Sequence, residues 1–221
     1  SKKVKVILSG DGADELFGGY NRYLLSKKYY KYLRLIPQNI KKNLQNFIFT
    51  NKYIISKITD QNNGLLGRKV NINSKTLDKM KQILLSKDFL EYYDRCVSTV
   101  YYPDKFDMSR KHLEKCNEEL PNQDPLIKMM LLDIIFFLPS DMLCKVDRAS
   151  MANSLEVRCP YLSKNVYDLS CAIPQNQKVD RNYNSKVILK QLIKKYIPGI
   201  DYNKKKKRFG VPIEKWLRSD L

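Results

Sequence analysis

The residues best suited to chemistry lie in a short turn near the start of the chain, residues 9–15 (SGDGADE). Its glycines leave backbone N–H groups open to close approach by a ligand. Its carboxylates are groups that hold Mg²⁺ beside phosphate oxygens. A helix that begins near Gly12 adds free N–H groups and a dipole that favour an anion. The residues alone leave two interpretations open: a metal–nucleotide site, or a turn between a strand and a helix whose acids only cap the helix.

A second group of charges lies in the middle of the chain. Asp147 and Arg148 adjoin each other on an otherwise apolar helical stretch, and Glu156 and Arg158 follow shortly after it. Buried ions are costly unless they are paired. The pattern therefore predicts an internal salt-bridge network that holds the later pair against the helix. Nothing in this stretch by itself points to a ligand.

A basic run near the end of the chain, Lys204–Arg208 (KKKKR), precedes Phe209–Pro212 (FGVP). Such a cluster can hold a pyrophosphate group, and one of its lysines can stabilise negative charge that develops in a transition state. A solvated basic loop or a weak nucleic-acid patch would have the same composition.

Composition narrows the class of protein. The 221 residues carry 41 Lys and Arg against 23 Asp and Glu, but most lysines are spread singly, so the net charge of +18 reflects general lysine abundance better than nucleic-acid binding. The five cysteines form no CxxC pair, which argues against a disulfide framework or a zinc site and favours reduced thiols in the cytoplasm. His112, the only histidine, is expected on a solvated helix, so histidine-based catalysis is not expected. No apolar run reaches the length of about 18 residues that a membrane span needs.

The elements that must position these residues are mostly helical. Residues 4–8 are apolar enough for a buried parallel strand, and little strand signal follows residue 25. A strand that ends in a small-residue turn and feeds a helix is how open α/β sheets build ligand sites. The apolar stretch 125–138 predicts a core helix that Pro139 ends, with Ser140 capping the next helix. Further helices are expected over 24–36, 40–58, from Ser74, from Ser86, over 104–116, over 165–172, from Ser185 and near Pro212, with turns or loops at 60–64, 67–73 and 153–163.

Three motifs, in this order, resemble the synthetase domain of glutamine-hydrolysing asparagine synthetases. They are SGDGADELFGGY at 9–20, LPSDML with KVDRASMANSLEVRCPYL at 138–162, and the basic run that leads to FGVP at 209–212. The resemblance implies an α/β parent fold of the adenine nucleotide α-hydrolase-like, ATP-pyrophosphatase type. Residues 1–221 would form part of that domain, mostly α-helical with one N-terminal parallel strand.

The resemblance also implies a chemistry. The family binds ATP and Mg²⁺, joins the side-chain carboxylate of aspartate to AMP, and lets ammonia attack the β-aspartyl-AMP. The ammonia comes from glutamine, which a separate N-terminal glutaminase domain hydrolyses. A cytoplasmic enzyme of amino-acid biosynthesis, a homodimer in its full-length form, would fit this pattern. The alternatives are a related amidotransferase that acts on another carboxylate, such as one in a surface polysaccharide or a peptide, and a basic nucleic-acid-binding helical module.

Residue roles follow from the matching motifs. By resemblance, Ser9 and Gly10 contact ATP, and Asp14 is the Mg²⁺ ligand. Asp11 lies where relatives have an acid near the acyl-adenylate, so it would orient or deprotonate the attacking amine. Lys206 matches the lysine that stabilises the transition state and pyrophosphate. The aspartate side of the pocket would be shaped by Asp147, Arg148, Glu156 and Arg158.

Several family features are missing or changed. The SGGxDS phosphate loop and the cysteine nucleophile of the glutaminase are absent from this sequence. Arg208 stands where many relatives have glycine, Lys204 where many have arginine, and residues 159–163 lack the usual Phe and final Asp. We therefore expect residues 1–221 to be the C-terminal two-thirds or so of a synthetase domain, without its glutaminase domain. This part should be inactive alone, and the sequence does not identify the carboxylate that the whole enzyme amidates.

Overall fold

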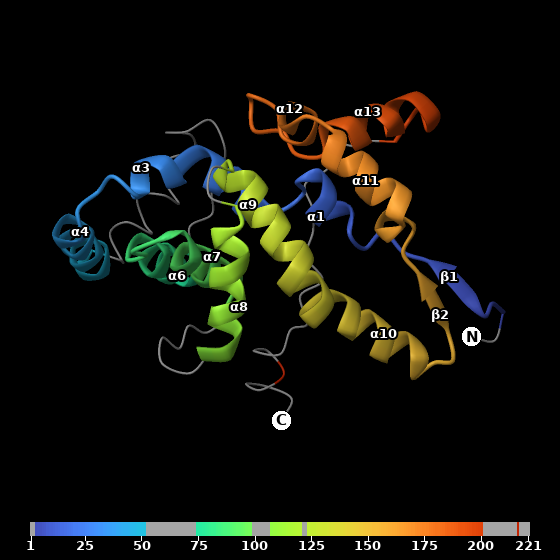
Figure 1. Cartoon of the computed structure of the whole chain (residues 1–221), viewed down its shortest axis with the longest axis horizontal. Coiled ribbons are helices and arrows are strands. Elements are labelled where there is room, and N and C mark those ends of the chain that lie inside the picture. Colours follow the sequence, from blue (N-terminus) through green and yellow to red (C-terminus); the bar gives the residue numbers. More distant parts are fainter. Residues whose placement is uncertain (1–2, 52–73, 99–106, 121–122, 201–215, 217–221) are drawn as a thin grey trace. The chain divides into compact units, whose positions relative to one another are not determined.

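The structure is a computed structural model that describes residues 3–51, 74–98, 107–120, 123–200 and 216. The chain divides into two compact units, residues 1–187 and 188–221. The helices of the first unit surround an apolar core, and a short parallel strand pair lies beside them (Figure 1). No helix in these described ranges is both long and apolar enough to cross a membrane.

The N-terminal strand is confirmed, and it has a partner that the sequence did not indicate. β1 (Val6–Leu8) pairs in parallel with β2 (Glu156–Arg158), in the register Val6 to Glu156. The prediction of an ordered turn over 153–163 was therefore wrong at these three residues, because their pairing depends on a strand about 150 positions away in the chain. The prediction that the first strand is buried was also wrong: the side chains of β1 are exposed, with Leu8 at 73%.

Helix α1 (Ala13–Phe17) follows β1 after a four-residue turn and buries Leu16 and Phe17. The prediction of a helix start near Gly12 is confirmed, since Gly12 is the N-cap. The next helical run consists of α2 (Asn21–Leu25), the π-helical η1 (Ser26–Tyr30) and α3 (Lys31–Leu33), which confirms a helical segment before Pro37.

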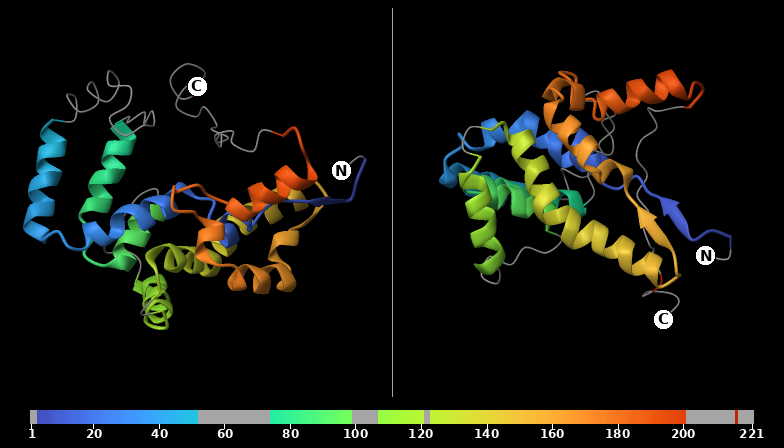
Figure 2. Two further views of the ribbon diagram at one scale, coloured as in Figure 1. Left: turned by 90° about the horizontal axis from the view of Figure 1, so that it is seen from above. Right: turned by 45° about the vertical axis from the view of Figure 1, so that its right-hand side comes forward.

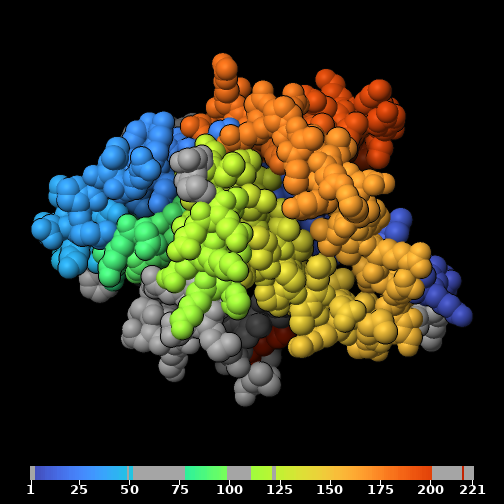
Figure 3. Space-filling model, in the orientation of Figure 1, coloured from blue at the N-terminus to red at the C-terminus, as the bar shows by residue number. Residues whose placement is uncertain are grey.

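The core of the first unit lies between α2, α7 (Phe89–Val97) and α9 (Pro125–Leu132). Its buried side chains include tyrosines as well as aliphatic residues, namely Tyr23, Tyr92, Tyr93, Leu126, Met129 and Leu132. α4 (Gln38–Thr50) packs beside α6 (Ser74–Leu84), as the left view of Figure 2 shows. α8 (Asp107–Glu118) lies against α7 and α9 on the face in view in Figure 3, and His112 is exposed on it, as predicted.

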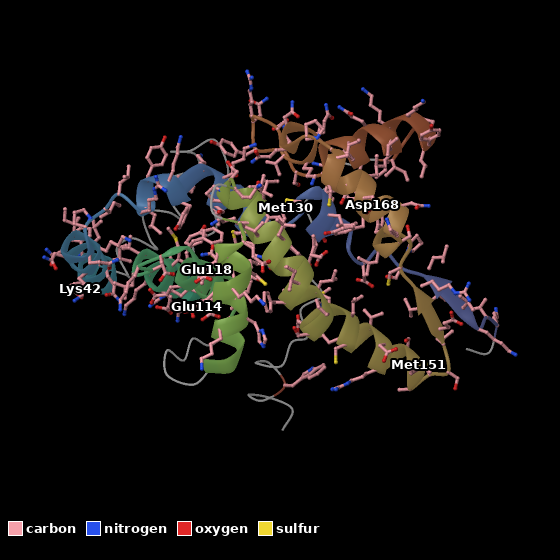
Figure 4. All side chains as sticks on the ribbon, viewed as in Figure 1. Lys42, Glu114, Glu118, Met130, Met151 and Asp168 are labelled. Carbon is pink, nitrogen blue, oxygen red and sulfur yellow. The ribbon has the colours of Figure 1, made fainter. Side chains whose placement is uncertain are left out.

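The apolar helix does not end at Pro139. α9 runs into a π-helical segment, η2 (Asp133–Leu143), and then into α10 (Cys144–Met151), so residues 125–151 form one helical run. The labelled Met130 and Met151 in Figure 4 lie on its first and last parts. A π-helix absorbs the missing N–H and the ring of a proline better than a regular α-helix, whose i to i−4 bonding the proline breaks. Ser140 caps nothing: its hydroxyl donates to the Phe136 carbonyl within the run.

Two other predicted helix caps, Ser86 and Ser185, were also wrong. Asp88, not Ser86, caps α7, because its carboxylate accepts from the Glu91 N–H at 2.8 Å. Ser185 forms an antiparallel bridge with Val179, and α13 (Val187–Tyr196) begins two residues later. The helix expected over 165–172 is confirmed as α11 (Lys164–Ala172), preceded by the short η3 (Pro160–Leu162) and followed by α12 (Gln175–Lys178).

The remaining predictions lie partly or wholly outside the described residues. The helix predicted over 40–58 is present to residue 50, and the rest of it lies outside the described residues. The turn at 60–64, the loop at 67–73 and the helix near Pro212 also lie outside the described residues.

Candidate functional site

The predicted turn begins where β1 ends. The Ser9 N–H donates to the Arg158 carbonyl at 2.9 Å, which continues the parallel pairing by one bond. The Ser9 hydroxyl donates to the Asp11 carboxylate and accepts from the Asp11 N–H at 3.1 Å. The carboxyl end of a parallel strand, followed after a short turn by a helix N-terminus, is where open α/β sheets bind ligands.

The two glycines of the turn have different surroundings. A Cβ added at Gly10 would meet nothing within 4 Å, so the backbone of Gly10 is open to a ligand. Gly12 has a φ of 88°, and an added Cβ would lie 2.9 Å from Leu162 Cγ. Gly12 therefore lets η3, which carries part of the middle motif, pack directly on the turn.

Asp14 lies in the first turn of α1 and forms an ion pair with Lys186. The Lys186 ammonium is 2.8 Å from Asp14 Oδ1. Gly19 covers this pair, since an added Cβ there would lie 2.7 Å from Asp14 Cγ and would also strike the Lys186 side chain. The Gly19 N–H donates to the Asp14 carbonyl at 2.8 Å, and this hydrogen bond holds the Gly19 backbone close to the pair.

A buried polar network supports α1 from the side of the core. The Tyr20 hydroxyl donates to Glu15 Oε1 at 2.8 Å, and the Arg22 guanidinium lies 4.0 Å from the centre of the Tyr20 ring. Arg22 donates twice to Asp133 Oδ2, from Nη2 at 2.6 Å and from Nε at 2.9 Å. Stacking on a ring face and hydrogen bonding to a carboxylate both suit a guanidinium.

Asp133 is the centre of this network and is inaccessible to solvent. Besides Arg22, its carboxylate accepts from the Tyr23 hydroxyl and, at 2.9 Å, from the Tyr93 hydroxyl. Burial raises the pKa of Asp133, and the hydrogen bonds and the guanidinium oppose that rise. Burial likewise raises the pKa of Glu15. Three elements, α2, α7 and η2, are thus joined at one carboxylate.

The charged residues of the middle motif are not arranged as predicted. Asp147 and Arg148 are exposed on α10, and Arg158 pairs with Glu156 at 2.7 Å on an exposed strand. The predicted buried network was therefore wrong, because these side chains face solvent in the described part of the chain. The structure does bring the backbone of Arg158 and the side chain of Cys159 to the turn, with Cys159 Sγ 3.8 Å from Ser9 Oγ.

A magnesium ion that arrives with a nucleotide suits the donors at this turn. Asp14 offers a partly buried carboxylate that already holds a cationic group, the Lys186 ammonium. Mg²⁺ commonly takes one or two carboxylates and completes its shell with phosphate oxygens and water. Within the described ranges, no group of three or more His, Cys, Asp or Glu side chains could hold a metal by itself. The Asp14 carboxylate is therefore a donor of the kind that Mg²⁺ takes together with phosphate oxygens.

The sequence did not indicate two residues of this site, Asp133 and Lys186. The single acid in the most apolar segment, Asp133, was a signal that could have indicated a buried partner. Lys186 had no such signal, since it is one of 41 basic residues. Lys206 lies outside the described residues, so its role stays a prediction.

Comparison with known proteins agrees with the three motifs. The family of asparagine synthases matches residues 1–221. The chain is 33% identical over 223 residues to asparagine synthetase [glutamine-hydrolyzing] 1 of Bacillus subtilis, covering 100% of this chain and 33% of that protein. It is 31% identical over 223 residues to putative glutamine-hydrolysing asparagine synthetases of Mycobacterium bovis and Mycobacterium tuberculosis, covering 99% of this chain and 31% of each relative.

The chain therefore spans about a third of the length of these curated relatives. No solved structure matches it. Because the family match extends over the whole chain and includes the turn, the strand pair and the helical run described above, this chain belongs to the asparagine synthase family.

Proposed function

We propose that this chain forms part of a synthetase domain that amidates aspartate to asparagine at the expense of ATP. The reaction would proceed through β-aspartyl-AMP, with ammonia derived from glutamine. The observation that carries the proposal is the turn at the end of β1, where the open backbone of Gly10 adjoins the carboxylates of Asp11 and Asp14. Support also comes from the relatives, which are named glutamine-hydrolysing asparagine synthetases.

In this proposal each residue of the turn has a separate task. Ser9 and the Gly10 backbone bind the nucleotide. Asp14 holds Mg²⁺, which neutralises phosphate charge when bound. Asp11 orients the ammonia that attacks the adenylate, or accepts a proton from it. The hydrogen bond from the Ser9 hydroxyl keeps the Asp11 carboxylate at the turn. Lys206 stabilises the charge that develops on the phosphates.

The pocket for aspartate is proposed to include Asp147, Arg148, Glu156 and Arg158. Their exposure leaves them accessible to a substrate rather than satisfied within the core. We also propose that the domain is of the ATP-pyrophosphatase type, that a glutaminase domain belongs to the same protein, and that the enzyme is a cytoplasmic homodimer.

The test is adenylate formation by the full-length protein, measured as aspartate-dependent exchange of label between pyrophosphate and ATP. Asp14→Asn should reduce the exchange rate at least about a hundredfold, by analogy with the loss of one group that stabilises transition-state charge. Asp168→Asn is the matched control, because Asp168 is an exposed acid on α11 that pairs with the nearby Lys164 (Figure 4).

Two outcomes would contradict the proposal. Exchange that survives Asp14→Asn would remove the metal assignment. Exchange that responds to another carboxylic acid and not to aspartate would make the protein a related amidotransferase with a different acceptor.

A further inference from the structure

We propose that Lys186 is an exchangeable counter-ion of Asp14: its ammonium occupies the cation position at this carboxylate and leaves it when a divalent cation binds. The inference rests on the proposed function, in which Asp14 is a metal ligand. It assigns a task to a residue outside the three motifs, and it predicts a competition that can be measured with metal alone.

Electrostatic repulsion opposes a second cation at the Asp14 carboxylate. The Lys186 Nζ lies 2.8 Å from Asp14 Oδ1, and the two side chains are only 30% and 19% exposed. Oδ1 itself is inaccessible to solvent. A divalent cation on either oxygen of this carboxylate would lie within a few ångströms of the ammonium, and like charges at that distance repel strongly where water is scarce. The ammonium must therefore move before a metal can bind.

Gly19 adjoins both side chains of the Asp14–Lys186 pair. Gly19 lies so close to the pair that a Cβ there would strike both the Asp14 carboxylate and the Lys186 side chain. Its N–H is bonded to the Asp14 carbonyl, which fixes the Gly19 backbone. The position where a Gly19 side chain would begin therefore has no space for a second cation, which favours exchange over joint binding.

The backbone of Lys186 is held in place, while its side chain is long enough to rotate. Its backbone has a φ of 54°, an uncommon value for a residue with a side chain. The segment before it is anchored: Asn184 donates from its backbone and its side chain to Asp180, each at 2.8 Å, and Lys27 Nζ donates to the Val179 carbonyl at 2.8 Å. Because the backbone is held, exchange requires only rotation of the long lysine side chain.

The Lys186 ammonium also brings positive charge to an acidic part of the fold. Asp14 lies in the first turn of α1, next to the buried Glu15. Lys186 reaches this carboxylate from a segment that comes about 170 residues later in the chain.

The test is a titration of the nucleotide-free, full-length protein with Mn²⁺, in which free Mn²⁺ is followed by electron paramagnetic resonance. If the Lys186 ammonium leaves the carboxylate open only part of the time, the apparent Mn²⁺ affinity of the wild type is reduced by that open fraction. In Lys186→Met the carboxylate is always open, so this variant should bind Mn²⁺ about tenfold more tightly than wild type. Lys186→Gly should behave in the same way and also relieves the backbone at φ 54°. Lys186→Arg, which keeps the charge, should stay close to wild type.

The controls separate exchange from a general loss of positive charge. Lys164→Met removes an ammonium that is also paired with a carboxylate, Asp168 at 2.5 Å, and should leave Mn²⁺ affinity unchanged. In an Asp14→Asn background, Lys186→Met should have no effect on affinity. Thermal unfolding of each variant checks that the fold is retained, and Lys186→Gly provides the second variant if the methionine disturbs it.

Two results would overturn the inference in distinguishable ways. If Asp14→Asn weakens Mn²⁺ binding but Lys186→Met and Lys186→Gly both match wild type, exchange is wrong and the metal assignment stands. If Asp14→Asn leaves Mn²⁺ binding unchanged, the metal assignment in the proposed function fails, and the exchange fails with it.

Discussion

At the scale of single residues, two glycines of one turn perform different tasks. Gly10 has open space where a side chain would begin, whereas Gly12 has a positive φ and lies against Leu162. The first is thus free for a ligand, and the second is needed for the turn itself to form. Their positions in the sequence, two apart in SGDG, do not reveal this difference.

Alanine substitutions should separate these tasks. Gly10→Ala should change the free energy of unfolding by less than about 0.5 kcal/mol, as surface substitutions usually do, while it weakens ATP binding to the full-length protein. Gly12→Ala should destabilise the protein by about 1–3 kcal/mol, because the residue must adopt a left-handed conformation and displace Leu162. Urea unfolding and nucleotide titration measure the two effects. A large loss of stability in Gly10→Ala, or none in Gly12→Ala, would contradict this division.

At the scale of elements, the helices of the core meet at polar groups as well as apolar ones. Asp133, the first residue of η2, accepts hydrogen bonds from Arg22 and Tyr23 of α2 and from Tyr93 of α7. Replacement of one partner of a buried charged pair is costly because the other charge is left uncompensated. The same network reaches α1 through Tyr20 and Glu15, so the packing of three helices contributes to the position of the acidic turn.

The buried tyrosines of α2 and α7 make stability sensitive to alkaline pH. Burial raises the pKa of Tyr23, Tyr92 and Tyr93 above the usual value. The folded protein therefore keeps phenolic protons that the unfolded chain loses above about pH 10, and stability should fall as pH rises through that region. Each such tyrosine contributes about 1.4 kcal/mol per pH unit.

Tyr93→Phe should remove one of these contributions. Its free energy of unfolding should fall less steeply above pH 10 than that of wild type, by about 1.4 kcal/mol per pH unit. Between pH 7 and 8 the slopes of both proteins should agree, which is the internal control. Urea unfolding followed by circular dichroism at a series of pH values gives the slopes, and equal slopes in the alkaline range would refute the role of Tyr93.

At the scale of the whole molecule, the chain carries one side of the proposed ATP site. It spans about a third of the length of its curated relatives, and its sequence has no SGGxDS loop. A triphosphate needs several donors arranged around it, and the described turn supplies only the hydroxyl of Ser9, the backbone of Gly10 and the carboxylates.

The isolated 221 residues should accordingly show no aspartate-dependent exchange of pyrophosphate into ATP. The full-length protein, assayed side by side at the same molar concentration, is the positive control. Circular dichroism of the isolated chain shows whether it is folded during the assay. Exchange by the isolated chain above the level of its Asp14→Asn variant would show that this chain holds a complete site.

Local sequence determined the elements whose signals lie within a few residues. The apolar run before SGDG predicted β1, Gly12 predicted the start of α1, and the pattern over 165–172 predicted α11. The order of the motifs also determined the family, which the comparisons confirm. These features depend on backbone preferences and on short patterns, so they can be inferred without the fold.

Tertiary structure alone decided the features that join distant parts of the chain. β2 is a strand only because β1 lies beside it, and a π-helix carries the long helical run past Pro139 where local preference predicted a stop. The exposure of Asp147 and Arg148 and the pairing of Lys186 with Asp14 were equally out of reach. For the strand pair and the Lys186–Asp14 pair the physical reason is the same: the free energy of a strand edge or of a buried charge depends on the partner that the fold brings to it, and here that partner lies more than a hundred residues away.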